Sequence, residues 1–283
     1  SSATSAVSKQ NLAVTLTNYN AAYDGSAHGI KVKVTSAEWT GGTIQSGTST
    51  SYGQNQENAV KNTEYELNPK YTNYTASTNI YFKIPGGDYY NDYTSNGTVA
   101  VSKKALTSTQ IPAYSTTWVS GNTTYTKSVS TGVGSETVTL TYTPYSNAVG
   151  TYTYATSSGS GKFTLSQTNT NYSISSAGNF TLTGAAITGS VTISGTATWG
   201  QTLTANPSCS VPSSGCSFSN YQWYSNGTAI SGATSATYVL PKEQVGKTIT
   251  VGVVASASNY ANKTLTSSAT SAVSKQNLAV TLT

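Results

Sequence analysis

The sequence predicts an all-β protein made of β-sandwich domains in tandem, and three observations support this. Short segments of alternating polar and apolar residues recur along the chain, among them IKVKVT at 30–35, ETVTLTYT at 136–143 and KTITVGVVAS at 247–256. Gly, Asn, Ser or Pro bound most of these segments, as they bound strands. Only 8% of the residues are charged, and 21 are tyrosine. This composition is typical of packed strands with a hydroxyl-rich surface and not of disorder.

Helical periodicity is nearly absent from the chain. The nearest approach to it is NQENAVKNTEYEL at 55–67, which matches a helical period poorly. Many short strands separated by turn residues are the pattern of sandwiches or small barrels.

An exact repeat links the two ends of the sequence. The seventeen residues SSATSAVSKQNLAVTLT stand at 1–17 and again at 267–283. One interpretation is a duplicated element captured at both ends. We favour a second interpretation, in which the chain is one period plus an overlap of an array that repeats every 266 residues, the offset between the two copies. Repeats at a fixed period are typical of stacked modular proteins.

Domain boundaries are expected where a strand ends at lysine and another strand begins. VAVSKKALT at 99–107 and SAVSKQNLAV at 271–280 share this pattern, and LTGAAITGSV at 182–191 marks a further joint. These joints are a few residues long with little Gly, so we expect short, stiff linkers. The sequence therefore predicts three sandwich domains at 11–104, 105–186 and 187–275. Residues 1–10 would be the last strand of a preceding repeat, and 276–283 the first strand of the next.

Three features of the third domain have specific structural interpretations. Trp223 lies in the middle of YQWYS and is expected to pack between two sheets rather than to bind a ligand. Asn226-Gly227 predicts a two-residue hairpin turn, because both positions of such a turn need positive φ. Cys209 and Cys216 could be free thiols, but a disulfide is favoured because no metal-site spacing accompanies them. A disulfide indicates an oxidising, extracellular compartment.

Several longer motifs resemble known bacterial modules. The third domain carries GSVTISGTATWGQTLTA, YQWYSNGTAISGATSATY and VGKTITVGVVAS, and it resembles the bacterial Ig-like repeats of large surface proteins over most of 189–260. The segment with Cys209 and Cys216 departs from that pattern. The first domain, with YNAAYDGSAHGIKVKVT, NPKYTNYTASTNIYFKI and YYNDYTSNGTVAVSKK, resembles MBG-type adhesin modules. The second resembles YDG-type modules through ISSAGNFTLTGAAITG. The resemblance implies three tandem Ig-like β-sandwich domains of a bacterial surface or secreted adhesin.

No catalytic residue, metal site or cofactor is expected. His28 is the one histidine of the sequence, lies in GSAHGI without an HExxH or other ligand cluster, and is expected to be a turn or edge residue. Glu64 with Glu66 and Asp88 with Asp92 are paired carboxylates in stretches that look solvated, whereas glycosidases need a carboxyl group in an apolar cleft. A calcium site at Asp88 and Asp92 is an alternative, but it lacks the ligand spacing of an EF-hand loop.

The order of residues in the sequence allows two kinds of covalent modification. Lys127, Glu136 and Asn179 stand in the chain order of an internal Lys–Asn isopeptide crosslink with its acid, without the sequence surroundings of that chemistry. Seven Asn-x-Ser/Thr sequons offer glycosylation sites in a host that glycosylates, and the abundance of Asn, Ser and Thr explains several of them by chance. They are Asn73, Asn96, Asn122, Asn171, Asn179, Asn226 and Asn262.

Two functions compete on these grounds, and an enzyme is the least expected. The first is a structural stalk or fibre segment of a repetitive extracellular protein that projects an adhesive or other tip. The second is a glycan- or mucin-binding adhesin module that uses exposed tyrosines of the first domain; its candidates are Tyr65, Tyr71, Tyr74, Tyr89, Tyr90 and Tyr93. These tyrosines could equally fill the sandwich of a chain poor in Phe.

The expected partners are copies of the same repeat. Strand 1–9 is expected to complete the third domain of a neighbouring copy, and a surface of low charge offers little repulsion against lateral fibre contacts. Host or matrix glycans are partners in the second reading. Nucleic acid is not expected, because the chain has no Arg and residues 11–104 hold equal numbers of lysines and acids. Membrane contact by this segment is not expected either, because no apolar span of membrane length occurs.

Overall fold

The computed structural model describes residues 6–277 and confirms an all-β fold. Within these residues the regular structure consists of strands, apart from one turn of 3-10 helix, η1 (Lys242–Gln244). The chain divides into two compact units. Unit 1 contains the residues up to 113 together with 125–142 and 164–178. Unit 2 contains 114–124, 143–163 and the residues from 179 onward.

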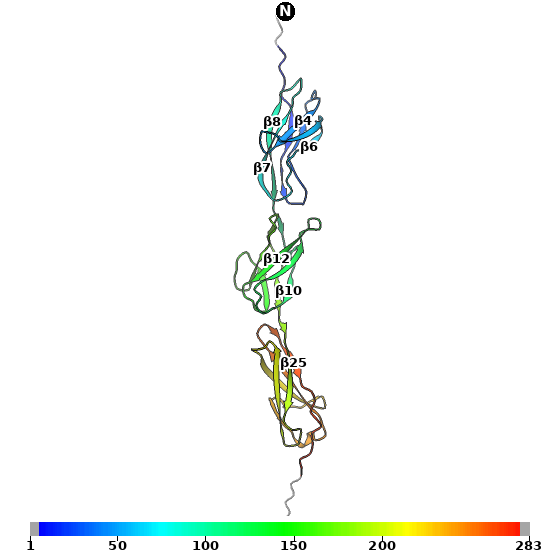
Figure 1. The fold of residues 1–283 in the computed structure, drawn as a ribbon, viewed down its shortest axis with the longest axis vertical. Coiled ribbons are helices and arrows are strands. Elements are labelled where there is room, and N and C mark those ends of the chain that lie inside the picture. Colours follow the sequence, from blue (N-terminus) through cyan, green and yellow to red (C-terminus); the bar gives the residue numbers. More distant parts are fainter. Residues whose placement is uncertain (1–5, 278–283) are drawn as a thin grey trace, which may run out of the picture. The chain divides into compact units, whose positions relative to one another are not determined.

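Unit 1 contains two antiparallel-rich sheets. Strands β1 (Val14–Thr17), β3 (Lys31–Val34) and β6 (Glu64–Glu66) form one sheet in the order β1-β3-β6. The other sheet has the order β2-β8-β7-β4-β5. Its strands are β2 (Tyr19–Ala22), β8 (Tyr93–Ser102), β7 (Thr75–Ile84), β4 (Gly42–Gly47) and β5 (Gln54–Ala59). β7 and β8 form a hairpin, and β4 pairs with β7 along its other edge. The three strands are labelled in Figure 1.

The alternating pattern of the sequence builds the core of unit 1. Val32 and Val34 of β3 are buried while Lys31 is exposed, and every second residue of β7 from Ile80 onward is buried. The two sheets approach closely at Gly97 of β8. A Cβ atom there would lie 2.9 Å from a methyl carbon of Leu16 in β1. Glycine at this position therefore lets the faces meet.

Two further strand pairs belong to unit 1. β9 (Lys104–Leu106) pairs in parallel with β15 (Tyr172–Ile174). β11 (Tyr125–Ser130) and β12 (Thr137–Pro144) pair antiparallel from Tyr125 opposite Tyr142 to Ser130 opposite Thr137. Residues 55–67, the nearest approach to a helical pattern, instead form most of β5, a turn in which Asn62 has φ +63°, and β6.

Unit 2 begins with a group of four strands. β10 (Tyr114–Thr117) pairs in parallel with β16 (Phe180–Thr183), and β13 (Gly150–Tyr154) pairs antiparallel with β16. β13 also pairs in parallel with the start of β14 (Lys162–Ser166). A short parallel pair of β17 (Ala185–Ala186) and β24 (Tyr260–Ala261) follows.

The rest of unit 2 forms two sheets around an apolar core. One has the order β18-β19-β22, from β18 (Thr188–Ser194), β19 (Thr202–Val211) and β22 (Thr237–Val239). The other has the order β21-β20-β23-β25, from β21 (Thr228–Ala229), β20 (Ser217–Ser225), β23 (Ile249–Ser256) and β25 (Lys263–Thr266). Leu203 of β19 and Val251 of β23 are buried in the same core cluster.

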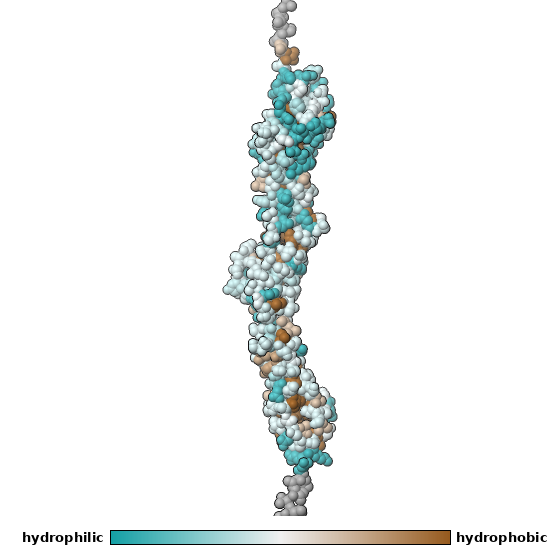
Figure 2. Space-filling view, viewed as in Figure 1, coloured by the Kyte–Doolittle hydropathy of each residue, from teal (hydrophilic) through white to brown (hydrophobic). Residues whose placement is uncertain are grey.

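Three expectations for this region are confirmed. Trp223 is fully buried in that cluster, and its indole N–H donates to the carbonyl oxygen of Ser235 over 2.9 Å. Asn226 and Gly227 have φ of +47° and +81° and join β20 to β21 as a hairpin. Cys209 and Cys216 form a disulfide. On the face that Figure 2 shows, hydrophilic and intermediate residues dominate and hydrophobic ones are scattered.

The closing segment of the third predicted domain differs from the full strand expected there. Within 267–275 only Val273 and Ser274 make strand-like contacts, as single parallel bridges to Val245 and Thr198. Val273 is the one large apolar residue in this run. Hydrogen bonds between Ser267 and Val251 and between Thr270 and Ile249 also hold the segment against β23. In the first copy, residues 1–5 lie outside the described residues and 6–9 belong to no strand. Residues 278–283 also lie outside the described part.

Candidate functional site

Unit 1 contains a carboxylate at the centre of a cluster of hydroxyl groups. Oε1 of Glu136 accepts a hydrogen bond of 2.5 Å from the hydroxyl of Tyr23, and its Oε2 accepts one of 2.6 Å from Tyr172. The hydroxyl oxygen of Thr131 lies 2.9 Å from that of Tyr172. We call these four residues the Glu136 cluster. It joins Tyr23 of the first predicted domain to three residues of the second.

Local backbone structure holds each member of this cluster in place. Tyr23 directly follows β2, and its amide donates to the carbonyl oxygen of Ser102 at the end of β8. Tyr172 begins β15. The turn between β11 and β12 is closed by hydrogen bonds between Thr131 and Glu136 and between Glu136 and Val133. The rings of Tyr23 and Tyr172 meet edge to face, with centroids 5.4 Å apart.

The cluster perturbs the acid–base equilibria of its members. The hydrogen bonds from Tyr172 and Tyr23 hold the pKa of Glu136 below its usual value of 4.5. Burial, and then the hydrogen bond to Glu136, raise the pKa of Tyr172 to about 12. Between these limits the carboxylate is ionised and the tyrosine protonated, which is the pair of states that the hydrogen bond requires.

A buried asparagine adds a second tie in the same part of unit 1. The side-chain oxygen of Asn171 accepts from the amide of Tyr74 over 2.7 Å, and its side-chain nitrogen donates to Oδ1 of Asn73 over 3.0 Å. Its main-chain oxygen accepts from the amide of Lys104. The ammonium of Lys103 lies 5.1 Å from the ring centroid of Tyr74. Residues of the first two predicted domains are thus held together by backbone, amide and ring contacts.

Unit 2 contains a comparable tie between residues of the second and third predicted domains. The rings of Trp118 and Tyr260 meet edge to face with centroids 5.4 Å apart. Asn259 accepts from the amide of Val149 with its side chain, over 2.9 Å, and from the amide of Ala185 with its main chain. A few aromatic rings and asparagine side chains therefore supply the contacts at both predicted boundaries.

These clusters hold separate segments of backbone together. Both oxygens of Glu136 accept hydrogen bonds from tyrosine hydroxyls. Among the residues that the structure describes, no group of three or more His, Cys, Asp and Glu side chains could hold a metal ion.

His28 lies at a sheet edge, in an isolated bridge with Tyr71. Its Nε2 is 3.0 Å from Oδ1 of Asp24 and its Nδ1 is 3.9 Å from Oε1 of Glu66. The imidazole stacks on Tyr19, with ring centroids 3.9 Å apart. Each ring nitrogen therefore faces a separate carboxylate.

Three of the four paired carboxylates of the sequence make separate ion pairs with lysines. Glu64 lies 3.3 Å from the ammonium of Lys31. Glu66 accepts from the amide of Gly29 and lies 3.2 Å from Lys70. Asp92 lies 2.9 Å from Lys83, which holds the pKa of this carboxyl group below its usual value. Asp88 is exposed.

The six candidate glycan-contacting tyrosines do not form one exposed platform. Tyr90 is buried, Tyr65, Tyr71 and Tyr93 are half-buried, and only Tyr74 and Tyr89 are exposed. The ten-residue strand β7 separates these two along the chain. The hydroxyls of Tyr65 and Tyr90 accept from the amides of Val60 and Glu38, so the structure gives both rings a packing role.

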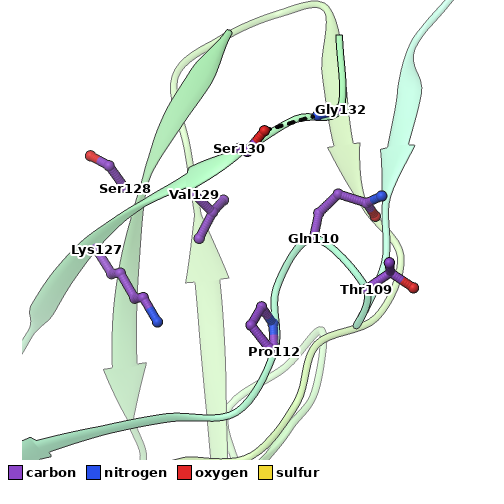
Figure 3. Close-up of a pocket in the computed structure, with 8 residues that line it drawn as sticks. All are labelled: Thr109, Gln110, Pro112, Lys127, Ser128, Val129, Ser130 and Gly132. Atoms are coloured by element: carbon purple, nitrogen blue, oxygen red, sulfur yellow. Dashed lines mark hydrogen bonds between the residues drawn. The ribbon is translucent and has the colours of Figure 1, made fainter. Parts of the chain in front are cut away.

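The candidate isopeptide residues have separate surroundings. Glu136 is held by the two tyrosines. Lys127, in β11, lines a shallow pocket of about 410 Å³ in unit 1 with Gln110, Pro112 and Val129 (Figure 3). Thr109, Ser128, Ser130 and Gly132 complete its lining. The main-chain oxygen of Asn179, in unit 2, accepts from the amide of Tyr114. With no aromatic ring or carboxylate in its lining, the pocket has little to offer a sugar.

The seven sequon asparagines differ in exposure. Asn171 is buried and uses its side-chain nitrogen in the tie to Asn73, which leaves no room for a glycan. The other six are exposed: Asn73, Asn96, Asn122, Asn179, Asn226 and Asn262.

Sequence reasoning considered Glu136 only as an isopeptide acid and missed Tyr23, Tyr172 and the role of Asn171. One signal was available. Glu136 is one of only two acidic residues after residue 92, in a chain with very little charge. A carboxylate in so uncharged a region indicates that hydrogen-bond donors surround it.

The chain was compared with known proteins on this basis. No family model matches it, and no curated protein matches it. In the described residues no helix is long and apolar enough to span a membrane.

Proposed function

We propose that this chain is a structural segment of a repetitive extracellular protein, a bacterial surface or secreted fibre with a period of 266 residues. It acts by setting length and stiffness, and it holds an adhesive or other tip domain away from the cell. Three Ig-like modules, the predicted domains at 11–104, 105–186 and 187–275, make up the period. The segment itself carries out no catalysis and needs no cofactor.

One comparison carries this proposal. Val7 and Val273 occupy the same position in the two identical copies of the repeat. Val273 is 2% exposed and belongs to the apolar core of unit 2, whereas Val7 is 98% exposed. The sequence around Val7 is thus the same sequence that, around Val273, packs into the core of the third module. A preceding third module would bury Val7 as this one buries Val273.

Two further features support the proposal. Ties of aromatic rings and asparagine side chains occur at both predicted module boundaries, as expected of modules that must not swivel freely. The Cys209–Cys216 disulfide is expected in an oxidising compartment, and this supports an extracellular location.

Imaging of the parent protein tests the proposal. Sandwich modules of roughly 35–40 Å each, stacked end to end, give a repeat on the order of 110 Å. An antibody raised against the third module should label thin fibres at that spacing. Isolated label on a short particle would contradict the stalk, and glycan binding by the first module would then be the function to pursue.

A further inference from the structure

The two copies of the repeat contact different modules, and together they define a joint that neither copy shows alone. We propose that consecutive copies of this chain share one extended segment, Val273–Asn277, and that Trp199 of one copy packs against Tyr89 of the next across it. The inference rests on the proposed function, since its partner is a second copy of this chain in the same array.

The third module binds the front part of this segment. The amide of Ser274 donates to the carbonyl oxygen of Ala197 over 2.8 Å, and the amide of Trp199 donates to the carbonyl oxygen of Ser274 over 2.9 Å. The pairing of Ser274 with Thr198 is parallel. Val273 is buried beside these contacts.

The first module binds the back part of the same sequence. Gln10, the equivalent of Gln276, donates its amide to the carbonyl oxygen of Tyr89 over 3.0 Å and accepts from the amide of Asn91 over 2.8 Å. This pairing, of Gln10 with Tyr90, is also parallel. Lys9 donates its ammonium to the carbonyl oxygen of Gly87.

Superposing the two sets of contacts on one segment places Trp199 next to Tyr89. Ser274 and Gln276 are two residues apart, and residues two apart in an extended chain direct their N–H and C=O groups to the same edge. In a parallel ladder the acceptor for Gln276 would be the carbonyl of Trp199 itself. In the joint that acceptor is Tyr89. Only Lys275 separates the residues held by the two modules, so no free linker remains between copies.

The third module already leaves space for this arrangement. At Gly200 the backbone has φ +81° and its amide donates to the carbonyl oxygen of Leu240, so the chain turns away from the segment directly after Trp199. A Cβ atom at Gly200 would collide with the side-chain amide of Gln276. Gln276 thus contacts the third module with its side chain. Its equivalent in the other copy, Gln10, pairs with the first module through its backbone.

The exposure of the two aromatic rings supports their pairing. Trp199 is 41% exposed and Tyr89 is 63% exposed, both among the large apolar side chains that the described fold leaves uncovered. At the other two predicted boundaries an aromatic pair, Tyr23–Tyr172 or Trp118–Tyr260, meets edge to face at 5.4 Å. Contact between Trp199 and Tyr89 would give the boundary between copies the same construction and bury two rings that otherwise face water.

A crosslinking experiment on a two-period chain, residues 1–266 followed by 1–283, tests the joint. The first period carries Trp199→Cys and the second carries Tyr89→Cys, while the Cys209–Cys216 disulfides stay oxidised. A short bismaleimide should link the two thiols at least about tenfold faster than in a control with Val239→Cys in place of Trp199→Cys, because juxtaposed groups have a far higher effective concentration. Val239 is 60% exposed, so the control thiol is equally reachable. Equal rates would overturn the inference.

A second measurement avoids substitution at the joint. Acrylamide should quench the tryptophan fluorescence of the two-period chain less than that of single chains at the same number of periods. The reason is that the Trp199 of the first period is covered at the joint, whereas the Trp199 of the second period stays exposed. Unchanged quenching would also overturn the inference. Both results are independent of the parent protein's size, so a failed joint and a failed array proposal can be told apart.

Discussion

The hydroxyl of Tyr23 donates a 2.5 Å hydrogen bond to Glu136, although 113 residues separate them in the sequence. Tyr23 belongs to the first predicted domain and Glu136 to the second, so this bond lies on the boundary between them. With Tyr172 as a second donor, this carboxylate adds to the tie that Asn171 makes with Asn73 and Tyr74 between the same two regions. The Glu136 cluster therefore makes the boundary specific.

Replacing the carboxylate should loosen this boundary. Glu136→Gln keeps the shape but removes the charge that strengthens both tyrosine hydrogen bonds, and hydrogen bonds to charged groups contribute about 1.5–3 kcal/mol. We expect a loss of this size in the free energy of opening of unit 1, measured by hydrogen exchange with mass spectrometry at peptides containing Tyr23 and Tyr172.

A matched control variant and a double-mutant cycle make this prediction specific. Glu38→Gln alters an exposed carboxylate of unit 1 and should change the opening free energy by less than about 0.5 kcal/mol. Tyr23→Phe combined with Glu136→Gln should cost less than the sum of the two single changes, because they remove one shared bond. Strict additivity would show that the bond contributes nothing.

The stability that the cluster provides should depend on pH at both ends of the scale. The folded pKa of Glu136 is lowered, so its contribution is complete above pH 4.5 and is lost as the pH falls through the folded pKa. The pKa of Tyr172 is raised from 10.0 to about 12, so its contribution is complete below pH 10 and is lost as the pH rises toward 12. Hydrogen exchange across this range, corrected for the intrinsic rate, should show opening at both limits. In Glu136→Gln the loss of stability at low pH should be smaller. An unchanged loss would show that other carboxyl groups cause it.

The disulfide should stabilise unit 2 without defining its fold. Cys209 and Cys216 are seven residues apart, and closing so short a loop contributes about 2–3 kcal/mol in the chain-entropy account. The double change Cys209→Ser with Cys216→Ser should lower the stability of unit 2 by about that amount and leave the far-ultraviolet circular dichroism spectrum intact. Unit 1 serves as the internal control, and a loss of stability there would point to an unrelated effect.

Truncation of two tryptophans of unit 2 should lower its stability by different amounts. Trp223 is fully buried in the apolar core, so Trp223→Ala should cost about 3–5 kcal/mol and open unit 2 first. Trp199→Ala should cost the single chain less than Trp223→Ala does, because Trp199 is already 41% exposed. In the two-period chain the same change should cost more, since Tyr89 then covers the ring. Urea unfolding of the three variants, each compared with its unsubstituted single or two-period parent, provides the comparison.

Local features of this fold could be predicted from the sequence because their causes are local. Asn226-Gly227 specifies its hairpin through backbone φ, and Trp223 occupies the buried face of an alternating strand. The disulfide follows from two cysteines placed close together. The all-β class follows from composition and alternation.

Long-range contacts could not be predicted in the same way. Nothing near Glu136 in the chain indicates that Tyr23 is its donor, because the meeting depends on how β2, β11 and β15 are placed. The parallel pairing of β9 with β15 likewise joins segments far apart in the sequence, and nothing local in either segment indicates it. The sequence predicts a strand at the closing segment 267–275, yet the segment bridges other strands only at Val273 and Ser274. Hydrogen bonds of Ser267 and Thr270 to β23 also hold it, so tertiary contact and not alternation positions the segment.

The most direct test of the account is the intact mass of the parent protein, measured after its release from the producing cell and without reduction of disulfides. The account predicts a mass that contains several copies of the 266-residue period, and limited proteolysis should yield a ladder of fragments spaced by one period. A parent protein that contains the seventeen-residue sequence only twice, with no further copies of the modules between, would contradict the array.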